Sequence, residues 1–288
     1  MTSVAIAGTG RMGTAFATRL IEQGNTVLVW NRSPDRADAA VAVGATRAPD
    51  LASITAADII LISLTDADAV QVVIGDLIAA GLAGKLIVDM STLLPQETQA
   101  IAAKVAEAGA DFVDCPVGGT VGPALKGQLL GMAGGTEAAV ARARPVLEQL
   151  CKRVEHLGPV GTGASMKLAV NLPLAVYWQT LAEAMALLKG SGISPETAIS
   201  VINDSSAGPT VLKNRAQVVI DTLNGSDQPG TFDIAGLSKD LGLALRQAAL
   251  SGRDLPLSTE VQKSYAQALE AGLGGFDGAS LTRYLTDD

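Results

Sequence analysis

The sequence predicts an α/β protein in which a doubly wound parallel sheet is followed by an all-helical C-terminal domain, and a long interdomain helix joins the two. Up to about residue 160, short β-rich runs alternate with helical segments, which is the pattern of a parallel sheet covered by helices. After Gly163 these runs stop and helical periodicity takes over. The 288 residues exceed the size at which one hydrophobic core usually stops growing. We therefore expect two domains, residues 1–160 and residues 161–288.

The strands of the N-terminal sheet are predicted from short apolar runs. The run "IILISL" is continuously apolar, as expected of a strand that is buried on both faces. Helical segments such as 36–43 and 98–108 separate the runs. Five runs form the main sheet and two later runs extend it: 3–7, 26–30, 58–64, 86–90 and 111–115, then 129–133 and 153–157.

The C-terminal half is predicted to be helical throughout. Ser194, Pro195 and Glu196 form a helix start, with a capping hydroxyl, a proline in the first turn and an acid facing the helix dipole. Pro173 lies in the first long helix and should bend it or mark a late start. Helical periodicity covers residues 164–189, 195–203, 237–249 and 257–271.

Composition restricts the partners and the compartment. The net charge of −8 leaves no general basic face, so nucleic acid and anionic membranes are not expected as partners, and any anion must be bound locally. Cys115 and Cys151 are too few for a disulfide framework and lie in apolar runs, which suits buried, reduced thiols. We find no basic leader and no apolar run of the length that spans a bilayer. We therefore expect a cytoplasmic protein.

The opening run "VAIAGTGRMG" predicts a dinucleotide-binding turn. Gly8, Gly10 and Gly13 have G-x-G-x-x-G spacing between a strand and a helix, the arrangement of a Rossmann domain. The first glycine allows a tight turn, the second lets pyrophosphate approach the backbone, and the third lets the helix pack closely on the strand. A glycine-rich turn of another α/β protein has the same spacing, but the strand–turn–helix context favours the cofactor site. The predicted loop also includes Thr9, Arg11 and Met12.

The end of the second strand favours NADP(H) over NAD(H). An NAD-selective site usually carries Asp or Glu here to bind the ribose 2′-hydroxyl. This chain has Asn31, Arg32 and Ser33 instead, and neutral or cationic donors suit a 2′-phosphate. Arg32 also fits an ordinary exposed position at a strand end.

Lys167 and Asn171 are the most informative polar residues of the C-terminal half. No His, Cys and acidic residues have metal-ligand spacing, and we expect His156 to be structural, so no metal site is predicted. Lys167 and Asn171 are four residues apart and share one helix face. In a cleft of low dielectric the lysine pKa would fall towards the working pH, which suits proton transfer. A surface lysine beside a capping asparagine has the same spacing, so the spacing leaves the role of Lys167 open.

Five ordered motifs give the chain a resemblance to the β-hydroxyacid dehydrogenase family. They are "GTGRMG", "DMSTLLP", "DCPVGGTVGPALKG", "GTGASMKLAVN" and "LSKDLGLAL". This family includes 3-hydroxyisobutyrate dehydrogenase, tartronate semialdehyde reductase and the glyoxylate/succinic semialdehyde reductases, and imine reductases resemble it. The resemblance implies an N-terminal domain like the NAD-binding domain of 6-phosphogluconate dehydrogenase, and a homodimer or homotetramer.

The resemblance also implies roles for individual residues. Lys167 matches the family's catalytic lysine, which protonates the carbonyl oxygen during reduction, and Asn171 matches an asparagine that helps hold the substrate. Lys239 matches a lysine that closes over the cofactor, and Asp240 beside it is expected to contact the substrate. Leu64, Thr65 and Thr92 match cofactor-contacting positions, although the family commonly has proline where this chain has Thr65.

The predicted substrate loop departs from the family pattern. Members that act on hydroxyacids commonly read Pro-Val-Ser-Gly-Gly, in which the serine and backbone N–H groups hold the substrate carboxylate. Here Gly118, Gly119 and Thr120 follow Pro116 and Val117, so the serine hydroxyl is lost. Losing such a charge-assisted hydrogen bond costs about 1.5–3 kcal/mol. Thr120 is a candidate to supply a hydroxyl two positions later.

Together these features predict an NADP(H)-dependent oxidoreductase that transfers a hydride between the nicotinamide and a small β-hydroxyacid or semialdehyde. An imine reductase is one alternative, because the altered loop is compatible with an uncharged substrate, although such enzymes typically carry Asp or Tyr at the position of Lys167. A non-catalytic NADPH-binding protein is the other alternative, although such relatives generally lack the lysine.

Overall fold

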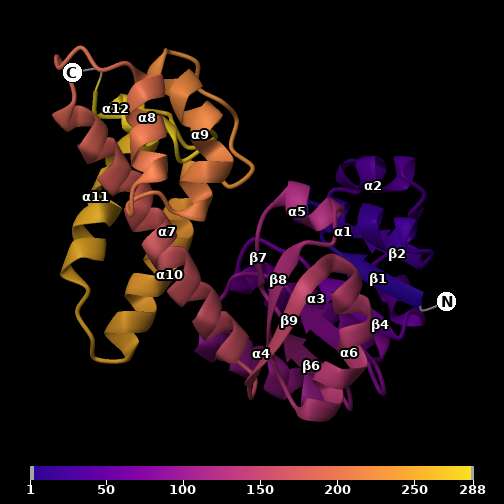
Figure 1. The fold of residues 1–288 in the computed structure, drawn as a ribbon. Coiled ribbons are helices and arrows are strands. Elements are labelled where there is room, and N and C mark those ends of the chain that lie inside the picture. The colour runs from indigo at the N-terminus through magenta and orange to yellow at the C-terminus, as the bar shows by residue number, and fades with distance from the viewer. Residues whose placement is uncertain (1–2, 287–288) are drawn as a thin grey trace. The chain divides into compact units, whose positions relative to one another are not determined.

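The computed structural model of the chain describes residues 3–286 (Figure 1). The chain divides into two compact units, the first ending at Lys167 and the second beginning at Leu168. The dividing point falls within the long helix α7 (Thr162–Leu187). The predicted order of an α/β part followed by a helical part is confirmed.

The first unit contains one sheet whose strands follow the order β3-β2-β1-β4-β5-β6-β8-β7, with β9 paired to β8. From β3 to β6 every pairing is parallel, and this is the strand order of a doubly wound dinucleotide-binding sheet. The two later runs extend the sheet as predicted, but β8 pairs antiparallel with β6 and parallel with β9. The strands are β1 (Ser3–Ala7), β2 (Thr26–Trp30), β3 (Thr46–Arg47), β4 (Ile59–Ile62), β5 (Leu86–Asp89), β6 (Asp111–Asp114), β7 (Val117–Gly118), β8 (Leu129–Gly134) and β9 (Cys151–Gly158).

Both faces of this sheet are covered by apolar side chains, because alternate residues of a strand point to opposite faces. In β4, Leu61 joins one core cluster, with Phe16 of α1 and Leu147 of α6, while Ile60 joins the other, with Ile74 of α3. The predicted helix at 36–43 forms as a short 3-10 turn followed by a short α-helix. The helical elements are α1 (Arg11–Glu22), η1 (Pro34–Ala37), α2 (Asp38–Ala42), η2 (Ala52–Ala56), α3 (Ala67–Ala80), α4 (Pro95–Glu107), α5 (Val121–Leu125) and α6 (Glu137–Leu150).

The second unit is helical and has its own core. Tyr265 is 0% exposed and its hydroxyl donates to the Ala175 carbonyl at 3.0 Å. The predicted start of α8 is confirmed, since the Ser194 hydroxyl accepts from the Thr197 N–H at 3.2 Å. Pro173 lies inside α7, which begins well before it. The helices after α7 are α8 (Pro195–Asp204), α9 (Thr210–Leu223), α10 (Ile234–Leu250), α11 (Pro256–Glu270) and α12 (Ser280–Tyr284).

Within residues 3–286, each helix is too short or too polar to cross a bilayer.

Candidate functional site

The turn after β1 requires glycine at two positions. Gly8 has φ +100°, and a Cβ atom there would lie 2.2 Å from the Ser63 carbonyl oxygen. A Cβ atom at Gly13 would lie 1.9 Å from the Gly8 carbonyl oxygen. Both neighbours are backbone atoms, which cannot rotate away, so these two glycines let α1 pack against the end of β1.

Gly10 differs, because a Cβ atom there would have no described atom within 4 Å beyond its own chain neighbours. It is the N-cap of α1, makes no side-chain cap and is followed by a first turn without an acidic residue. The Gly8 and Thr9 N–H groups are already bonded, to the Trp30 carbonyl and to Asn31, so it is the start of α1, with the positive end of its dipole, that faces open space, which suits a phosphate group. Arg11 is exposed beside it and Met12 packs against the core. These residues fit a pyrophosphate-bearing cofactor.

The end of β2 is tied to this turn through Asn31. The Asn31 Oδ1 atom accepts from the Thr9 N–H at 3.1 Å, and its Nδ2 atom donates to the Ser33 carbonyl at 3.0 Å. Thr9 Oγ1 in turn donates to the Arg36 carbonyl at 2.9 Å. Asn31 thus holds the two loops together, and a contact of Asn31 or Ser33 with the cofactor stays a prediction.

Arg32 and Arg36 leave a local positive region at this strand end. Both side chains are exposed, and within residues 3–286 neither guanidinium has a hydrogen bond or an ion pair. The neighbouring cation Arg47 is instead paired with Asp38. Two unpaired guanidinium groups on a protein of net charge −8 are a suitable local partner for a phosphate.

The loops after β4 and β5 carry Leu64, Thr65 and Thr92, and hydrogen bonds connect them. The Ser91 hydroxyl accepts from the Leu64 N–H at 3.1 Å, and the buried Asp89 carboxylate accepts from the Ser91 N–H at 3.0 Å. Thr65 is exposed, and its hydroxyl donates to Asp66 at 2.7 Å. Asp89 and Ser91 were not predicted as site residues, although an acid at the end of an apolar strand is a visible signal in the sequence.

The predicted substrate loop contains one glycine that the fold requires and one that it does not. Gly119 has φ +114°, and a Cβ atom there would lie 2.8 Å from Leu129 Cδ2. A Cβ atom at Gly118 would lie 3.5 Å from Leu130 Cβ, which is an ordinary contact. Thr120 is the N-cap of α5 but its side chain makes no capping bond. The contacts around position 118 therefore do not require a glycine there.

Lys167 lies in the second turn of α7 and its side chain is half-buried. The start of this helix is held by Asp114, at the end of β6, which is 2% exposed. Asp114 Oδ1 accepts from the Gly161 N–H and Oδ2 from the Ala164 N–H, both at 2.8 Å. Burial raises the pKa of Asp114, and these backbone hydrogen bonds act in the opposite direction. No role was predicted for Asp114 from the sequence.

In the second unit, a buried carboxylate orients Asn171. The Asn171 side chain is 3% exposed, and its Nδ2 atom donates to Asp240 Oδ2 at 2.7 Å. Lys239 lies next along α10, with its Nζ atom 3.5 Å from Asp240 Oδ1. Three predicted site residues of this unit therefore meet at one carboxylate.

The two cysteines are buried, free thiols. Burial raises the pKa of Cys151 to about 12 and also raises the pKa of Cys115, so both stay protonated at neutral pH and neither is an activated nucleophile. Within residues 3–286, no three His, Cys, Asp or Glu side chains are arranged to hold a metal ion.

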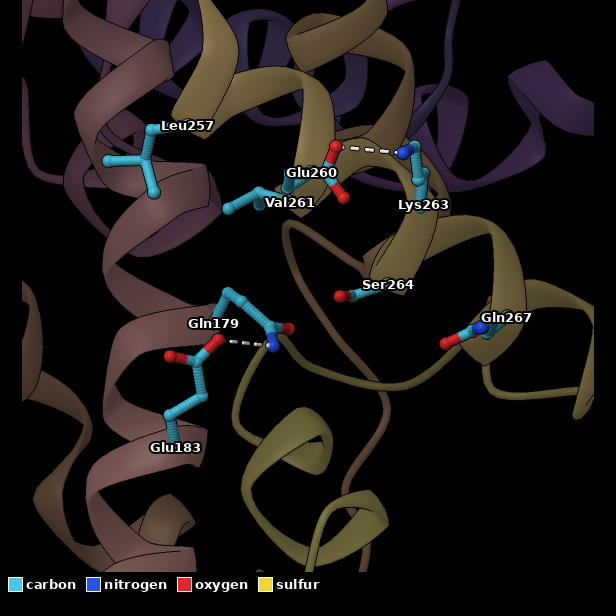
Figure 2. Close-up of a pocket in the computed structure, with 8 residues that line it drawn as sticks. All are labelled: Gln179, Glu183, Leu257, Glu260, Val261, Lys263, Ser264 and Gln267. Atoms are coloured by element: carbon cyan, nitrogen blue, oxygen red, sulfur yellow. Dashed lines mark hydrogen bonds and ion pairs between the residues drawn. The ribbon is translucent and has the colours of Figure 1, made fainter.

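A groove of about 280 Å³ lies on the second unit between α7 and α11 (Figure 2). The Gln179 amide donates to Glu183 at 3.0 Å, and Lys263 pairs with Glu260 at 2.7 Å. These polar groups satisfy one another, and no predicted site residue lines the groove. Its lining is Gln179, Glu183, Leu257, Glu260, Val261, Lys263, Ser264 and Gln267.

Both halves of the chain match known domain families. Residues 3–158 match the NAD binding domain of 6-phosphogluconate dehydrogenase. Residues 161–285 match the family described as NAD-binding of NADP-dependent 3-hydroxyisobutyrate dehydrogenase.

Individual relatives match over nearly the full length. The chain is 34% identical to 2-(hydroxymethyl)glutarate dehydrogenase of Eubacterium barkeri, over 94% of this chain and 90% of that protein. It is 30% identical to glyoxylate/succinic semialdehyde reductase 1 of Arabidopsis thaliana, over 95% of each chain.

Solved structures extend the likeness to the fold. The structure of Mycobacterium tuberculosis 3-hydroxyisobutyrate dehydrogenase with L-serine has a TM-score of 0.88 at 29% identity and covers 99% of both chains. Psf3 in complex with NADP+ and 2-OPP has a TM-score of 0.87 at 27% identity, over 98% of this chain and 99% of that one. An imine reductase from Pseudomonas sp. has a TM-score of 0.67 at 23% identity, over 97% and 98%, which shows a shared fold only.

The glycine turn gives a paired test. Gly10→Ala should fold normally, because its Cβ atom meets no protein atom, but should raise the Kd for NADPH about tenfold or more by filling the space that a phosphate would use. Gly13→Ala should lower the free energy of unfolding by about 1–3 kcal/mol, because its Cβ atom would overlap a backbone oxygen. Thermal unfolding and fluorescence titration with NADPH measure the two effects. Unchanged NADPH affinity in Gly10→Ala would contradict this assignment.

Proposed function

Since the chain belongs to the β-hydroxyacid dehydrogenase family and is an oxidoreductase of the NAD(P)-binding type, we propose that it transfers a hydride between NADP(H) and a small carboxylate that bears a primary alcohol or an aldehyde. The observation that carries the proposal is the start of α1 at Gly10, which has no side-chain cap and lies beside open space. The names of the relatives, which are hydroxyacid dehydrogenases and semialdehyde reductases, support the substrate class.

The first unit supplies the groups that would hold the cofactor. The Gly8–Gly13 turn would bind the pyrophosphate, and the loops after β4 and β5, with Leu64, Thr65 and Thr92, would line the nicotinamide end. When bound, the cofactor supplies or accepts the hydride. The hydrogen bonds from Asp89 through Ser91 to Leu64 keep two of these loops in a fixed relation, which supports a site that is formed before the cofactor arrives.

Lys167 is the proposed proton donor. In the reduction, its ammonium group gives a proton to the carbonyl oxygen as negative charge develops there, and in the oxidation the neutral amine accepts that proton back. The half-buried state of Lys167 supports this role, since a fully solvated ammonium would be poorly placed for proton transfer. Asn171, one turn later on α7 and oriented by Asp240, is proposed to hold the substrate.

The cofactor preference is proposed to come from Arg32. Its guanidinium is exposed just after β2 and has no partner among the described residues, at the position where an acid would select the ribose 2′-hydroxyl of NAD. Arg36, four residues later and likewise without a partner in the part of the chain that the structure describes, is a second cation for a 2′-phosphate. This pair favours NADP(H) over NAD(H).

The proposal extends to the roles of the two parts of the chain, to its assembly and to its place in the cell. We assign residues 1–160 to cofactor binding and residues 161–288 to substrate binding and oligomer formation, with Lys239 contacting the cofactor. The assembly is proposed to be a homodimer or homotetramer, and its place in the cell the cytoplasm.

Lys167→Ala should lower kcat by about 10²–10⁴-fold, because a positioned acid contributes that much to such a step, while the Kd for NADPH stays near that of the natural chain. Turnover is measured with succinic semialdehyde, glyoxylate and 3-hydroxyisobutyrate, beside a panel of cyclic imines. Lys152→Ala, an exposed lysine of β9, is the matched control. Retained turnover in Lys167→Ala would refute the role of the lysine, and turnover of imines alone would refute the substrate class.

Arg32→Ala should raise the Kd for NADPH by about tenfold or more and leave the Kd for NADH nearly unchanged, because one charge-assisted hydrogen bond is worth about 1.5–3 kcal/mol. Fluorescence titration with both cofactors measures this difference. Arg47→Ala, which removes a nearby cation that is already paired with Asp38, should change neither value. An equal loss for the two cofactors would contradict a contact with the 2′-phosphate.

Gly118→Ser should be tolerated, because its Cβ atom has only ordinary contacts, and should raise kcat/KM for 3-hydroxyisobutyrate by about tenfold through one added hydrogen bond to the carboxylate. Gly119→Ser is the matched control and should destabilise the protein, since its φ of +114° strains any side chain. A fall in kcat/KM for Gly118→Ser, with normal folding, would mean that the loop does not bind the carboxylate.

A further inference from the structure

The carboxylate of Asp114 makes long-range contacts with the beginning of α7. It accepts from the N–H groups of Gly161 and Ala164, which lie 47 and 50 residues later in the chain. Hydrogen bonding from the Gly163 backbone also favours its charged form. All four residues belong to the first unit, as does Lys167.

These contacts replace a side-chain cap that the helix itself cannot provide. The first N–H groups of a helix have no partner within it, and a side chain just before the helix usually accepts from them. In α7 that position is Gly161, which has no side chain. The Asp114 carboxylate therefore performs the capping function from the end of a strand.

Two glycines leave room for the Asp114 carboxylate. A Cβ atom at Gly134 would lie 2.6 Å from Asp114 Oδ1, and one at Gly163 would lie 2.8 Å from Oδ2. Two glycines, one on β8 and one in the first turn of α7, therefore let the carboxylate approach the helix N–H groups.

A gain in folding stability does not explain why a carboxylate is buried at position 114. Burial disfavours the charged form of Asp114 and is the largest influence on its pKa, and a buried charge is weak evidence for added stability. What the contact does fix is the geometry of one helix turn. Ala164, the last donor to the carboxylate, precedes Lys167 by three residues, which is just under one turn.

We propose that Asp114 is a positioning residue of the reaction: by anchoring the first turn of α7 to the end of β6, its carboxylate fixes the place of the Lys167 ammonium relative to the cofactor loops of the same unit. The inference rests on the proposed role of Lys167. It assigns to Asp114 no contact with substrate or cofactor, and its effect on turnover passes through the helix.

The test compares Asp114→Asn with Asp111→Asn in the full-length chain. Both residues lie on β6, but Asp111 is exposed and pairs with Arg142 at 3.1 Å, so its variant is the matched control. In Asp114→Asn one amide oxygen still accepts, while the amide N–H₂ group faces a second donor. We expect kcat to fall by about 10–100-fold, since a misplacement near 1 Å can cost that much, with the Kd for NADPH close to that of the natural chain.

A second readout needs no substrate. Acetic anhydride acylates the Lys167 amine, and peptide mass spectrometry measures the rate with and without saturating NADPH. Bound NADPH should slow this labelling in the natural chain and in Asp111→Asn, and the protection should be largely lost in Asp114→Asn. A purely structural role of Asp114 would lower the thermal midpoint and leave the protection of Lys167 unchanged.

The outcomes separate the inference from the proposed function. If NADPH fails to protect Lys167 in the natural chain, the proposed role of the lysine fails. If protection and kcat in Asp114→Asn equal those of the natural chain, only the role of Asp114 is overturned.

The double variant gives a further test. In a Lys167→Ala background, Asp114→Asn should reduce the remaining turnover no further, and a full additional loss would also overturn the role of Asp114. Should Asp114→Asn fold poorly, Asp114→Ser, which keeps one acceptor oxygen, provides the same comparison.

Discussion

The close approach of α1 to the end of β1 is the constraint on which the cofactor half depends. At Gly13 the helix comes so near to the Gly8 carbonyl that no side chain fits, and at Gly8 the turn passes equally close to Ser63. This packing brings the positive end of α1 to the carboxyl edge of the sheet, where parallel strands deliver their loops. Gly10, which no such contact requires, leaves the helix start open at the same place.

Local charge explains how an acidic chain can hold a polyanionic cofactor. With a net charge of −8, the protein as a whole repels phosphate, so attraction must come from groups at short range. Under the proposed function, the start of α1 supplies one part, and the guanidinium groups of Arg32 and Arg36, which have no partner within residues 3–286, supply another. Nearby Arg47 is neutralised by Asp38, which confines the positive region to the end of β2.

The sequence was informative where local pattern determines structure and uninformative where distant residues meet. The run at 59–64 predicted a strand because burial on both faces demands continuous apolar residues, and the glycine spacing predicted the turn. The antiparallel β8 depends on pairing with β6, which no local run reveals. Helix α12 is only five residues long, and α9 follows Pro209 without a side-chain cap, so neither offered a clear local signal. Likewise, the partners of Asp114 lie 47 and 50 residues away, so "DFVDC" showed an acid but not its purpose.

Buried carboxylates recur in this chain as orienting groups. Asp89 and Asp114 are neighbours in the β5–β6 register, and each accepts from backbone N–H groups of a segment that carries predicted site residues. Asp240 does the same for the Asn171 side chain in the second unit. Each acid is almost fully buried, where an ionised group is unfavourable unless donors surround it. A neutral acceptor would be less unfavourable to bury, but it would hold its donors less strongly, because hydrogen bonds to charged groups are the stronger ones. The common use of buried acids at these three places is therefore best explained by the need to hold specific groups still, rather than by a gain in stability.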